Sequence, residues 1–597
     1  METPESIYAL KQADFEKSRS YFHSYCKAFA WLRLLSFLAI LLFIYVALTS
    51  EVPVYGFVLA GVSALAMTIL IYFNITYGKK RDHYECLAGL CAREIKALEN
   101  DFLEFPTGNE FIDGSHAYSS DIDLFGTGSA YQYINRTVTH MGKNCLANWL
   151  SGSCLVPKEI IARQEACREM SLQTDWRLQF EAAGLEKEVA DSPESLLRWT
   201  RLQDLFKHHA NLVRFIRICQ AIMLIVFTVV LAGWINKNYL VFLGLVNLGI
   251  VWAYLHKINQ VSHLFGKTYS MMAKYSKLFS KISQSGFSAS WIQQRIRVLG
   301  TGDGSAATEI GALRKLLQQF DSRNNILVGF FRNALFLTDL MLVIKMEAWR
   351  QKNKDNIQKW MDVLGEVDAI NGLATFAFNN PGYAYPRLAG DEFTIEAMEL
   401  GHPLIPSGER VCNDFSLKGW HSLVVLTGAN MAGKSTFLRT IGINHILAHT
   451  GAPVCAGSYR FKPAMLITSI RTNDSLIKHE SYFYAELKKL KSMIDALEQG
   501  HEVFILLDEV LKGTNSNDKL NGSIILIKKL LQLQTSGIIA THDISLGELE
   551  NGFSDNIINR CFEAEISNGQ LVFDYKLKLG TAKNMTAIFL MKQMNIV

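Results

Sequence analysis

The stretch "LVVLTGANMAGKSTFLRT", Leu423–Thr440, decides the fold of this chain. Residues 428–435 within it fit the pattern G-x-x-x-x-G-K-[ST], a loop that holds nucleotide phosphates between a strand and a helix. The β-branched run "SLVVLT" before the loop predicts the strand, and "STFLRTIGINHILA" after it predicts the helix. We therefore predict a strand, a loop and a helix that bind a nucleoside triphosphate.

The residue types of this loop predict how ATP is bound. Backbone N–H groups of the loop and of the helix N-terminus would surround the phosphate oxygens. Lys434 would neutralise β- and γ-phosphate oxygens, and the Ser435 hydroxyl would be a Mg²⁺ ligand. The predicted ATP-binding residues of the loop are Gly428, Ala429, Asn430, Met431, Ala432, Gly433, Lys434, Ser435 and Thr436.

Two later stretches predict the rest of the site. "EVFILLDEV" reads as a buried strand that ends in Asp508, expected to hold Mg²⁺ through water, and Glu509, expected to act as base or to position water. "GIIATHD" brings His542 to the same edge of a parallel sheet, where it could contact the γ-phosphate or the attacking water. The predicted catalytic residues are Lys434, Glu509 and His542, and the predicted metal ligands are Ser435 and Asp508. Elsewhere an acidic pair or a lone histidine is more often structural, but the preceding loop favours catalysis here.

Composition limits the class of protein. The 597 residues leave room for roughly three or four domains. Hydrophobic residues make up 49%, which is high for a purely soluble enzyme, and the net charge of +4 does not by itself indicate a nucleic-acid binder. The ten cysteines form no CxxC pair, which argues against a zinc site or a disulfide framework and suits a cytoplasmic body.

Two pairs of apolar runs predict two transmembrane helical hairpins, at about 34–50 with 53–77 and at about 218–236 with 239–255. Lysine and arginine flank both pairs, so the positive-inside rule predicts a multi-pass protein of the cell (inner) membrane with its soluble domains in the cytoplasm. Buried core helices remain an alternative for the shorter runs. A fifth apolar run, residues 325–344, contains Arg332 and Asp339, which predicts a packed soluble helix instead.

The run of motifs resembles the ATPase domain of the MutS family of DNA mismatch-repair proteins, a branch of the ABC-type ATPases. "TGANMAGKST" is similar to the family's "TGPNMGGKST", with alanine at 429 and 432 as departures. "LLDEVLKGTNSND" is similar to "LLDEIGRGTST.DG", and "ATHD" to "ATHY". "NDSLIKHESYFYAELKKL" resembles the counterpart of the ABC signature, which implies that Ser481 reaches the γ-phosphate bound on the other subunit. The transporter form "LSGGQ" is absent from the sequence.

The resemblance implies an α/β P-loop (ABC-type) ATPase domain at the C-terminus, preceded by an all-α core and lever domain that also carries the two hairpins. The helical core would begin near Asp121, with "DIDLFGTGSAYQYINRTVTH". The expected domains are an N-terminal hairpin segment (1–82), first core and lever helices (83–206), a second hairpin (207–260), further lever helices (261–390) and the ATPase domain (391–597).

These expectations combine into a membrane-anchored ATPase that works as a homodimeric clamp or lever, with the lipid bilayer as one partner and mismatched or branched DNA as a candidate partner. We expect this protein to lack the mismatch-reading N-terminal domain of the family, because an apolar hairpin stands near the start of the sequence instead. "FLE" at 102–104 fits its Phe-x-Glu pattern, but a match so short is expected by chance. The alternative is an ATP-driven role in membrane remodelling or transport with no DNA contact. Against transport, the four spans hold almost no ionisable residues, which is typical of anchors.

Overall fold

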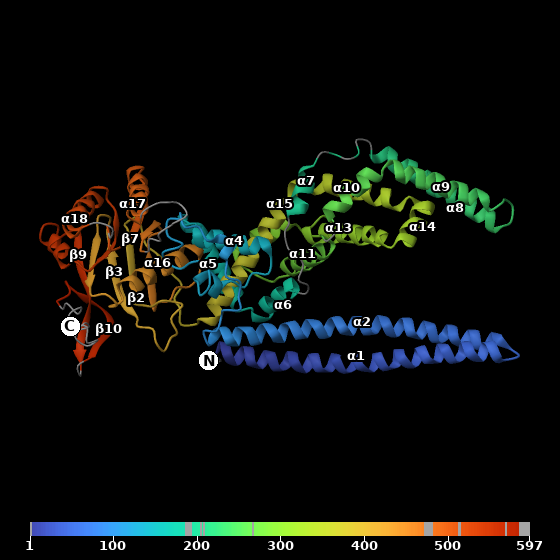
Figure 1. Ribbon diagram of the computed structural model, residues 1–597, viewed down its shortest axis with the longest axis horizontal. Coiled ribbons are helices and arrows are strands. Elements are labelled where there is room, and N and C mark those ends of the chain that lie inside the picture. Colours follow the sequence, from blue (N-terminus) through green and yellow to red (C-terminus); the bar gives the residue numbers. More distant parts are fainter. Residues whose placement is uncertain are drawn as a thin grey trace. The chain divides into compact units, whose positions relative to one another are not determined.

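The computed structural model describes residues 3–185, 194–202, 204, 206, 209–265, 268–470, 482–511, 515–567 and 570–583. The chain forms two compact units, each assembled from three separate segments (Figure 1). Unit 1 comprises Met1–Glu99, Thr174–Ser285 and Leu299–Met361, and unit 2 comprises Asn100–Gln173, Gly286–Val298 and Asp362–Val597. The five domain boundaries expected from the sequence stay a prediction.

Unit 1 begins with two long helices that lie side by side, α1 (Pro4–Thr49) and α2 (Pro53–Leu98) (Figure 1). Thr3 caps α1 by accepting a hydrogen bond from Ser6 N–H, and a proline occupies the first turn of each helix. The helices approach closely beside their connecting turn, where a Cβ on Gly56 would lie 2.6 Å from the Cβ of Ala47. A small residue is therefore needed at position 56.

Further from the turn, aromatic rings from both helices pack against one another, and we call this group the aromatic cluster. Phe22 stacks on Tyr84 with ring centroids 5.6 Å apart, and Phe29 stacks on Phe73 at 5.9 Å. Its members are Phe22, Tyr25, Phe29, Phe73, Tyr77 and Tyr84. The rings fix how α1 and α2 align, because each pair fits only at one register. The cluster lies where the charge-free run of α2 gives way to Lys79–Arg81.

The other helices of unit 1 come from its two later segments. They are α6 (Thr174–Leu185), α7 (Glu194–Arg201), α8 (His209–Leu231), α9 (Asn238–Ala253), α10 (Leu255–Phe265), α11 (Thr268–Ser283), α13 (Ala306–Asp321), η2 (Ser322–Asn324), α14 (Ile326–Phe336) and the first part of α15 (Thr338–Asn379). Ion pairs join α6 to the long helices, from Lys11 to Asp175 at 2.6 Å and from Arg93 to Glu181.

Among the described residues, three helices are long and apolar enough to cross a membrane: α1, α2 and the Asn211–Leu231 part of α8, with mean hydropathies of 2.3, 2.2 and 2.1. The count reaches five if two bent pairs are each one span, α9 with α10 (bent by 59°) and α14 with α15 (bent by 82°). One predicted boundary is wrong, since α8 ends at Leu231 rather than 236 and Gly233 continues with φ at +76°. That these helices cross a membrane stays a prediction.

The fifth apolar run does not form the single packed helix expected from the sequence. It is divided at Leu337, whose φ of +50° ends α14 and turns the chain into α15. In α15 the apolar side chains Leu340 and Val343 are fully buried, as expected. In α14, however, Ile326 is 83% exposed and Phe331 59% exposed, so the prediction is wrong for this half.

The C-terminal carbonyls of α14 are satisfied by side chains rather than by a continuing helix. Asn247 of α9 donates from Nδ2 to the Ala334 carbonyl at 2.8 Å, and Gln220 of α8 donates to the Phe336 carbonyl at 2.6 Å. Gly244 of α9 faces Ala334, and a Cβ added at Gly244 would be in ordinary van der Waals contact with the Cβ of Ala334, at 3.7 Å. The end of α14 is thus fastened to α8 and α9.

Unit 2 is built around β-sheets. Its described residues form a six-stranded sheet in the order β10-β9-β4-β8-β7-β6 and a four-stranded sheet in the order β1-β5-β2-β3. The strands are β1 (Arg387–Leu388), β2 (Thr394–Leu400), β3 (Asn413–Lys418), β4 (Leu423–Gly428), β5 (Ser458–Phe461), β6 (Met465–Ser469), β7 (Val503–Asp508), β8 (Ser536–Thr541), β9 (Ile557–Ser567) and β10 (Gln570–Leu579). All neighbours in the larger sheet are parallel except β9 and β10.

Helices cover both faces of the six-stranded sheet, which explains why β4, β7 and β8 are buried at every residue. Leu423 and Val425 of β4 join one core with α17 (Tyr482–Glu498) and α18 (Ser516–Gln532). The other face packs on α16 (Lys434–Thr450), where a Cβ on Gly442 would lie 3.3 Å from Leu506. The strands and the helix predicted around 423–450 are therefore present.

The remaining helices of unit 2 come from upstream segments. They are η1 (Asn109–Phe111), α3 (Ala130–Ile134), α4 (His140–Ser151), α5 (Pro157–Ser171), α12 (Ser290–Leu299), the end of α15, and η3 (Ile544–Asn551).

Candidate nucleotide site

The loop between β4 and α16 depends on two glycines. At Gly428 a Cβ would lie 2.7 Å from the Phe562 carbonyl oxygen of the neighbouring strand β9, so no side chain fits there. Gly433 has φ at +105°, a conformation that side chains disfavour, and a Cβ there would meet the ring of Tyr575 at 3.1 Å. The loop can therefore pass close to β9 and turn directly into the first residue of α16.

Lys434 is the first residue of α16 and bends back over the loop. Its Nζ donates hydrogen bonds to the carbonyl oxygens of Gly428, at 2.7 Å, and Ala429, at 2.9 Å. The side chain is 5% exposed. The ammonium group is thus held at the centre of the loop, next to the N–H groups at the start of α16, and both attract an anion.

Ser435 and Asp508 meet although they lie 73 residues apart. The Ser435 hydroxyl donates to Asp508 Oδ2 at 2.5 Å, because β4 and β7 flank β8 and end at the same edge of the sheet. Hydroxyl and carboxylate oxygens are ligands that suit Mg²⁺. Within the part of the chain that the structure describes, no group of three or more His, Cys, Asp or Glu could hold a metal ion, so phosphate oxygens and water would have to supply the other ligands.

Glu509 and His542 form a second pair at this edge. Glu509 has φ at +51°, and its backbone N–H donates to the Ala540 carbonyl of β8 at 2.8 Å, which fixes its position. Glu509 Oε1 lies 3.2 Å from His542 Nδ1, and Lys519 Nζ lies 3.5 Å from His542 Nε2. The carboxylate of Glu509 and the ring of His542 therefore face one another at this edge of the sheet.

A cavity of about 390 Å³ opens over the loop. Of the predicted residues it is lined by Ala429, Asn430, Met431, Gly433, Lys434, Ser435, Thr436 and Glu509. Gly428, Ala432, Asp508 and His542 do not line it, although Asp508 touches Ser435, and Ala432 is buried beneath the loop.

Sequence reasoning missed ten of the residues that line this cavity, and three of them are polar residues close to the loop or to one another. Tyr575, His402 and Asn413 also line it, and Asn413 donates from Nδ2 to the Tyr575 carbonyl at 3.0 Å. Burial lowers the pKa of His402 to about 4, so this ring is neutral near pH 7. The segment "GHPLI…VCND" was the signal that could have located two of them, but nothing in the sequence around Tyr575 pointed to the loop.

The same part of the chain is similar in sequence to known proteins. The family model for MutS domain V matches residues 424–596. This region is therefore related to domain V of the MutS family. It is similar to the DNA mismatch repair protein MutS of Fusobacterium nucleatum (30% identity over 234 residues, 38% of this chain and 26% of that protein) and of Aquifex pyrophilus (32% over 242 residues, 40% and 28%). For MutS of Halalkalibacterium halodurans the identity is 31% over 273 residues, 43% of this chain and 31% of that protein.

The likeness has a limited extent. The matched region spans 26–31% of the length of these three MutS relatives. Ser481, which the MutS resemblance assigns to the partner's nucleotide, lies outside the described residues, as do Gly513 and Thr514 of the "GTNSND" loop.

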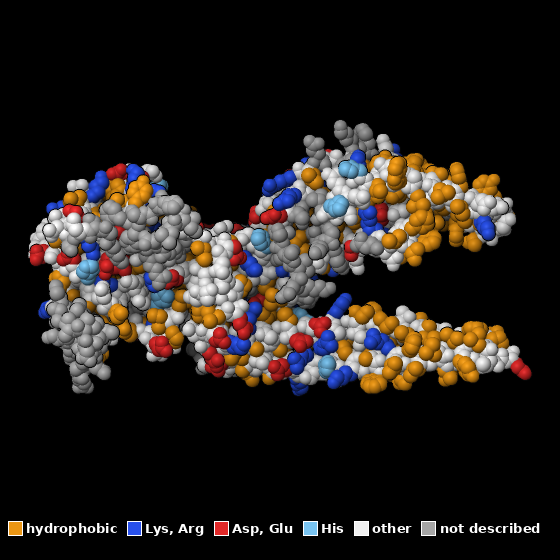
Figure 2. Space-filling view, in the orientation of Figure 1, with side chains coloured by type: hydrophobic (Ala, Val, Ile, Leu, Met, Phe, Trp, Pro, Cys, Tyr) orange, Lys and Arg blue, Asp and Glu red, His pale blue; other side chains and the backbone are white. Residues whose placement is uncertain are grey.

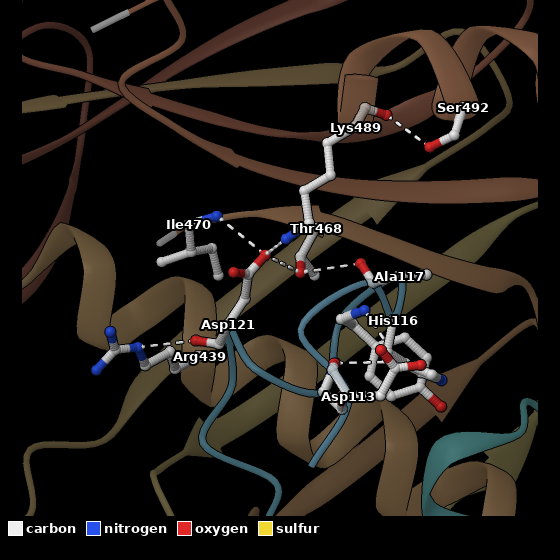
Figure 3. Close-up of polar contacts among 11 residues, drawn as sticks. Asp113, His116, Ala117, Asp121, Arg439, Thr468, Ile470, Lys489 and Ser492 are labelled. Atoms are coloured by element: carbon white, nitrogen blue, oxygen red, sulfur yellow. Dashed lines mark hydrogen bonds and ion pairs between the residues drawn. The ribbon is translucent and has the colours of Figure 1, made fainter. Parts of the chain in front are cut away.

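One buried carboxylate ties the MutS domain to the upstream segment of unit 2 (Figure 3). Asp121 is fully buried and accepts hydrogen bonds from Thr468 Oγ1 at 2.6 Å and Lys489 Nζ at 2.7 Å. The same carboxylate oxygen also accepts a hydrogen bond from the Ile470 N–H at 3.2 Å. Arg439 of α16 donates to the backbone carbonyl oxygen of Asp121 at 3.1 Å. Asp121 thus contacts the described elements on either side of residues 471–481, the end of β6 and α17.

Proposed function

We propose that this chain is a membrane-anchored, Mg²⁺-dependent ATPase of the MutS type, which binds ATP in the cavity over the 428–435 loop. The observation that carries the proposal is the convergence of Lys434 with the Ser435–Asp508 contact at 2.5 Å. A buried ammonium, a hydroxyl and a carboxylate meet there at the N-terminus of a helix. This is the donor set that a magnesium-bound triphosphate requires.

The chain's own residues have separate parts in binding. Lys434 Nζ would exchange its two loop carbonyl acceptors for β- and γ-phosphate oxygens, which are stronger acceptors because they are charged. Loop N–H groups would donate to the same phosphates. Bound Mg²⁺ would neutralise phosphate charge, with Ser435 and Asp508 as its protein ligands.

Hydrolysis would depend on Glu509. Its carboxylate would orient a water molecule and accept the proton as the water oxygen attacks the γ-phosphorus. His542 would hold that carboxylate through the 3.2 Å contact at Nδ1. Lys434 would stabilise negative charge that develops on the phosphate oxygens in the transition state.

The proposal extends to a homodimer and a bilayer. Ser481 would complete the site on the partner subunit. ATP would then bind the closed pair of domains more tightly than the open pair and so stabilise the closed state. The helices α1, α2, α8 and α9 would anchor each subunit in the cell membrane with the soluble parts in the cytoplasm. The lever helices would carry the closing motion towards the bilayer.

Two substitutions test the ATPase. We expect Glu509→Gln to keep ATP binding but lower turnover by about 10²- to 10⁴-fold, since it removes only the proton acceptor. Lys434→Ala should weaken binding and turnover together. ATP affinity and steady-state phosphate release of the purified, bilayer-reconstituted protein are the measurements. Lys491→Ala, an exposed lysine of α17, is the control. Wild-type turnover in both site variants would refute the proposal.

DNA binding needs its own test, because the matched MutS relatives are named for DNA mismatch repair and this chain aligns with less than a third of their length. Mismatched and matched duplexes would be titrated against the reconstituted protein at increasing salt. A DNA role predicts binding that weakens steeply with salt and favours the mismatch. Equal, negligible retention of both duplexes would leave the membrane-remodelling role as the better proposal.

A further inference from the structure

A cavity of about 640 Å³ in unit 1 lies apart from the nucleotide loop and has no part in the proposed hydrolysis. It is formed by α1, α2, α6 and α11 and by Gln284, which directly follows α11. Trp176 of α6 donates from Nε1 to the Lys281 carbonyl of α11 at 3.4 Å, and Arg93 of α2 pairs with Glu181 of α6. The walls are therefore held together by direct contacts.

The lining of this cavity is strongly basic. It includes Lys79, Lys80, Lys277 and Lys281, together with His83. All of its lining residues are described by the structure, and none of them is aspartate or glutamate. The carboxylates nearest along α2 face other cations, as Asp82 pairs with Arg81 at 2.6 Å and Glu85 with Arg19 at 3.7 Å.

Neutral hydrogen-bond donors accompany the lysines. Ser276 and Ser280 of α11 line the cavity together with Gln284, which directly follows the helix, and Gln284 Nε2 donates to Ser280 Oγ at 3.1 Å. Across from them, His83 Nε2 lies 3.0 Å from Gln179 Oε1 of α6. Ammonium groups with hydroxyl and amide donors on several sides form a site for a compact anion with several acceptor oxygens, such as a phosphate.

The cavity lies at the level where the apolar part of α2 ends. Residues 52–78 carry no charge, and Lys79 and Lys80 follow at once. The aromatic cluster surrounds the same point, and Lys80 Nζ lies 5.4 Å from the ring centre of Phe22 and 5.6 Å from that of Tyr77. Tyrosine rings and lysines at the end of an apolar span are typical of the headgroup layer of a membrane.

We propose that this cavity binds the phosphate of an anionic phospholipid headgroup. The inference rests on the proposed membrane placement of α1 and α2. A phosphodiester would lie among Lys80, Lys277 and Lys281, with Ser276 and Ser280 donating to its oxygens, while the acyl chains follow the charge-free part of α2. A basic cavity between helices on the cytoplasmic side of a membrane attracts such headgroups.

The test compares the full-length protein with a triple variant, Lys80→Gln, Lys277→Gln and Lys281→Gln. Both are reconstituted into bilayer discs of phosphatidylcholine with and without 30 mol% phosphatidylglycerol, and bound lipid is measured by mass spectrometry after gentle extraction. We expect the wild-type protein to retain phosphatidylglycerol over phosphatidylcholine. The triple variant should lose that preference by about tenfold or more, since each lysine at a membrane surface contributes appreciably.

A matched control removes the same charge elsewhere, with Lys315→Gln, Lys354→Gln and Lys359→Gln on exposed positions of α13 and α15. This control should keep the preference for phosphatidylglycerol. Equal loss in both triple variants would mean that net charge rather than the cavity selects the lipid, which overturns the proposal. Inorganic phosphate that abolishes phosphatidylglycerol retention at millimolar concentration would also overturn it, in favour of a site for free phosphate.

Failure of this inference differs from failure of the proposed function. ATP turnover in phosphatidylcholine discs should be the same in the wild-type and triple-variant proteins, because none of the three lysines lines the nucleotide cavity. A protein that stays in the discs and hydrolyses ATP but shows no lipid preference would refute the lipid site alone. A protein that does not enter the discs would refute the membrane anchor.

Discussion

At the scale of single residues, Asp121 of the MutS-like unit is a fully buried carboxylate with three hydrogen-bond donors. Its carboxylate is fully buried and balances the ammonium group of Lys489 at 2.7 Å. Removing one charge of a buried pair leaves the other without compensation. The same carboxylate also accepts from Thr468 and from the Ile470 N–H, so its loss would disturb both the end of β6 and α17.

We therefore expect Asp121→Asn to destabilise unit 2 by about 3 kcal/mol, since an amide cannot neutralise Lys489. The measurement is denaturant unfolding of the purified protein, with hydrogen exchange to locate the change at Ile470 and along α17. Asp555→Asn, on the short segment before β9, gives the same change of charge outside this network. Equal exchange at Ile470 in Asp121→Asn and wild type would contradict the assigned role.

A site residue could be predicted from the sequence when its position is marked by the residues next to it in the chain. Ser435, Asp508 and Glu509 were predictable because each ends or begins an element whose pattern is visible in the sequence. Asp121 and Tyr575 were not, because their partners are 368 and 162 residues away in the chain. Contacts between residues so far apart in the chain become visible only in the folded structure.

At the scale of elements, α16 carries two histidines into the interior. His445 and His449 are both fully buried, with rings 4.4 Å apart, and His445 also packs 5.3 Å from Phe504. Burial lowers the pKa of His445 to about 4, and burial together with His445 lowers the pKa of His449 well below its usual value. Protons therefore bind the unfolded chain more tightly than the folded helix.

This difference makes stability depend on pH. The neutral, buried His445 contributes fully to the free energy of unfolding above the unfolded pKa of 6.5, and this contribution is lost as the pH falls below that value. At pH 5 we expect His445 alone to cost roughly 2 kcal/mol of unfolding free energy. Denaturant midpoints at pH 7 and pH 5 measure the loss, and His445→Phe should reduce it. His501→Phe, at an exposed position, should leave the pH dependence as in the wild type.

The C-terminus of α14 is held by a side chain from another helix. Because the helix stops at Phe336, the Ala334 carbonyl depends on Asn247 Nδ2. We expect Asn247→Leu to destabilise the α9–α14 packing by about 1–2 kcal/mol, since it leaves a buried acceptor without its donor. Thermal unfolding in detergent is the measurement, and Val246→Leu, 43% exposed on the same helix, is the control. A midpoint unchanged by Asn247→Leu would show that water or lipid can replace the amide.

Elements differ in how well the sequence predicts them. β4 and β7 were predictable because a short apolar run between polar loop residues is typical of a buried strand. The division between α14 and α15 was not, because Leu337 takes a positive φ that leucine rarely adopts and only tertiary packing imposes. A lone Asn247 within "YLVFLGLVNLGIVWAYL" was the available sign of a polar partner nearby.

At the scale of the whole molecule, the proposed site needs two subunits. If Ser481 of the partner subunit completes each nucleotide site, ATP turnover per subunit should rise with protein density in the membrane and then level off. Reconstitution at increasing protein-to-lipid ratios, with phosphate release as the readout, measures this. Turnover per subunit that stays constant over a hundredfold dilution in lipid would contradict a shared site.

The division of unit 2 into separated segments has a consequence during synthesis. α1 and α2 are neighbours in the chain, so they can pair as soon as they leave the ribosome, whereas Asp121 must wait for Lys489, 368 residues later. At roughly 5–20 residues per second this delay lasts about 20–70 s. For that time the carboxylate of Asp121 lacks the ammonium partner that it has in the finished fold, so we expect this segment to depend on chaperone protection during synthesis.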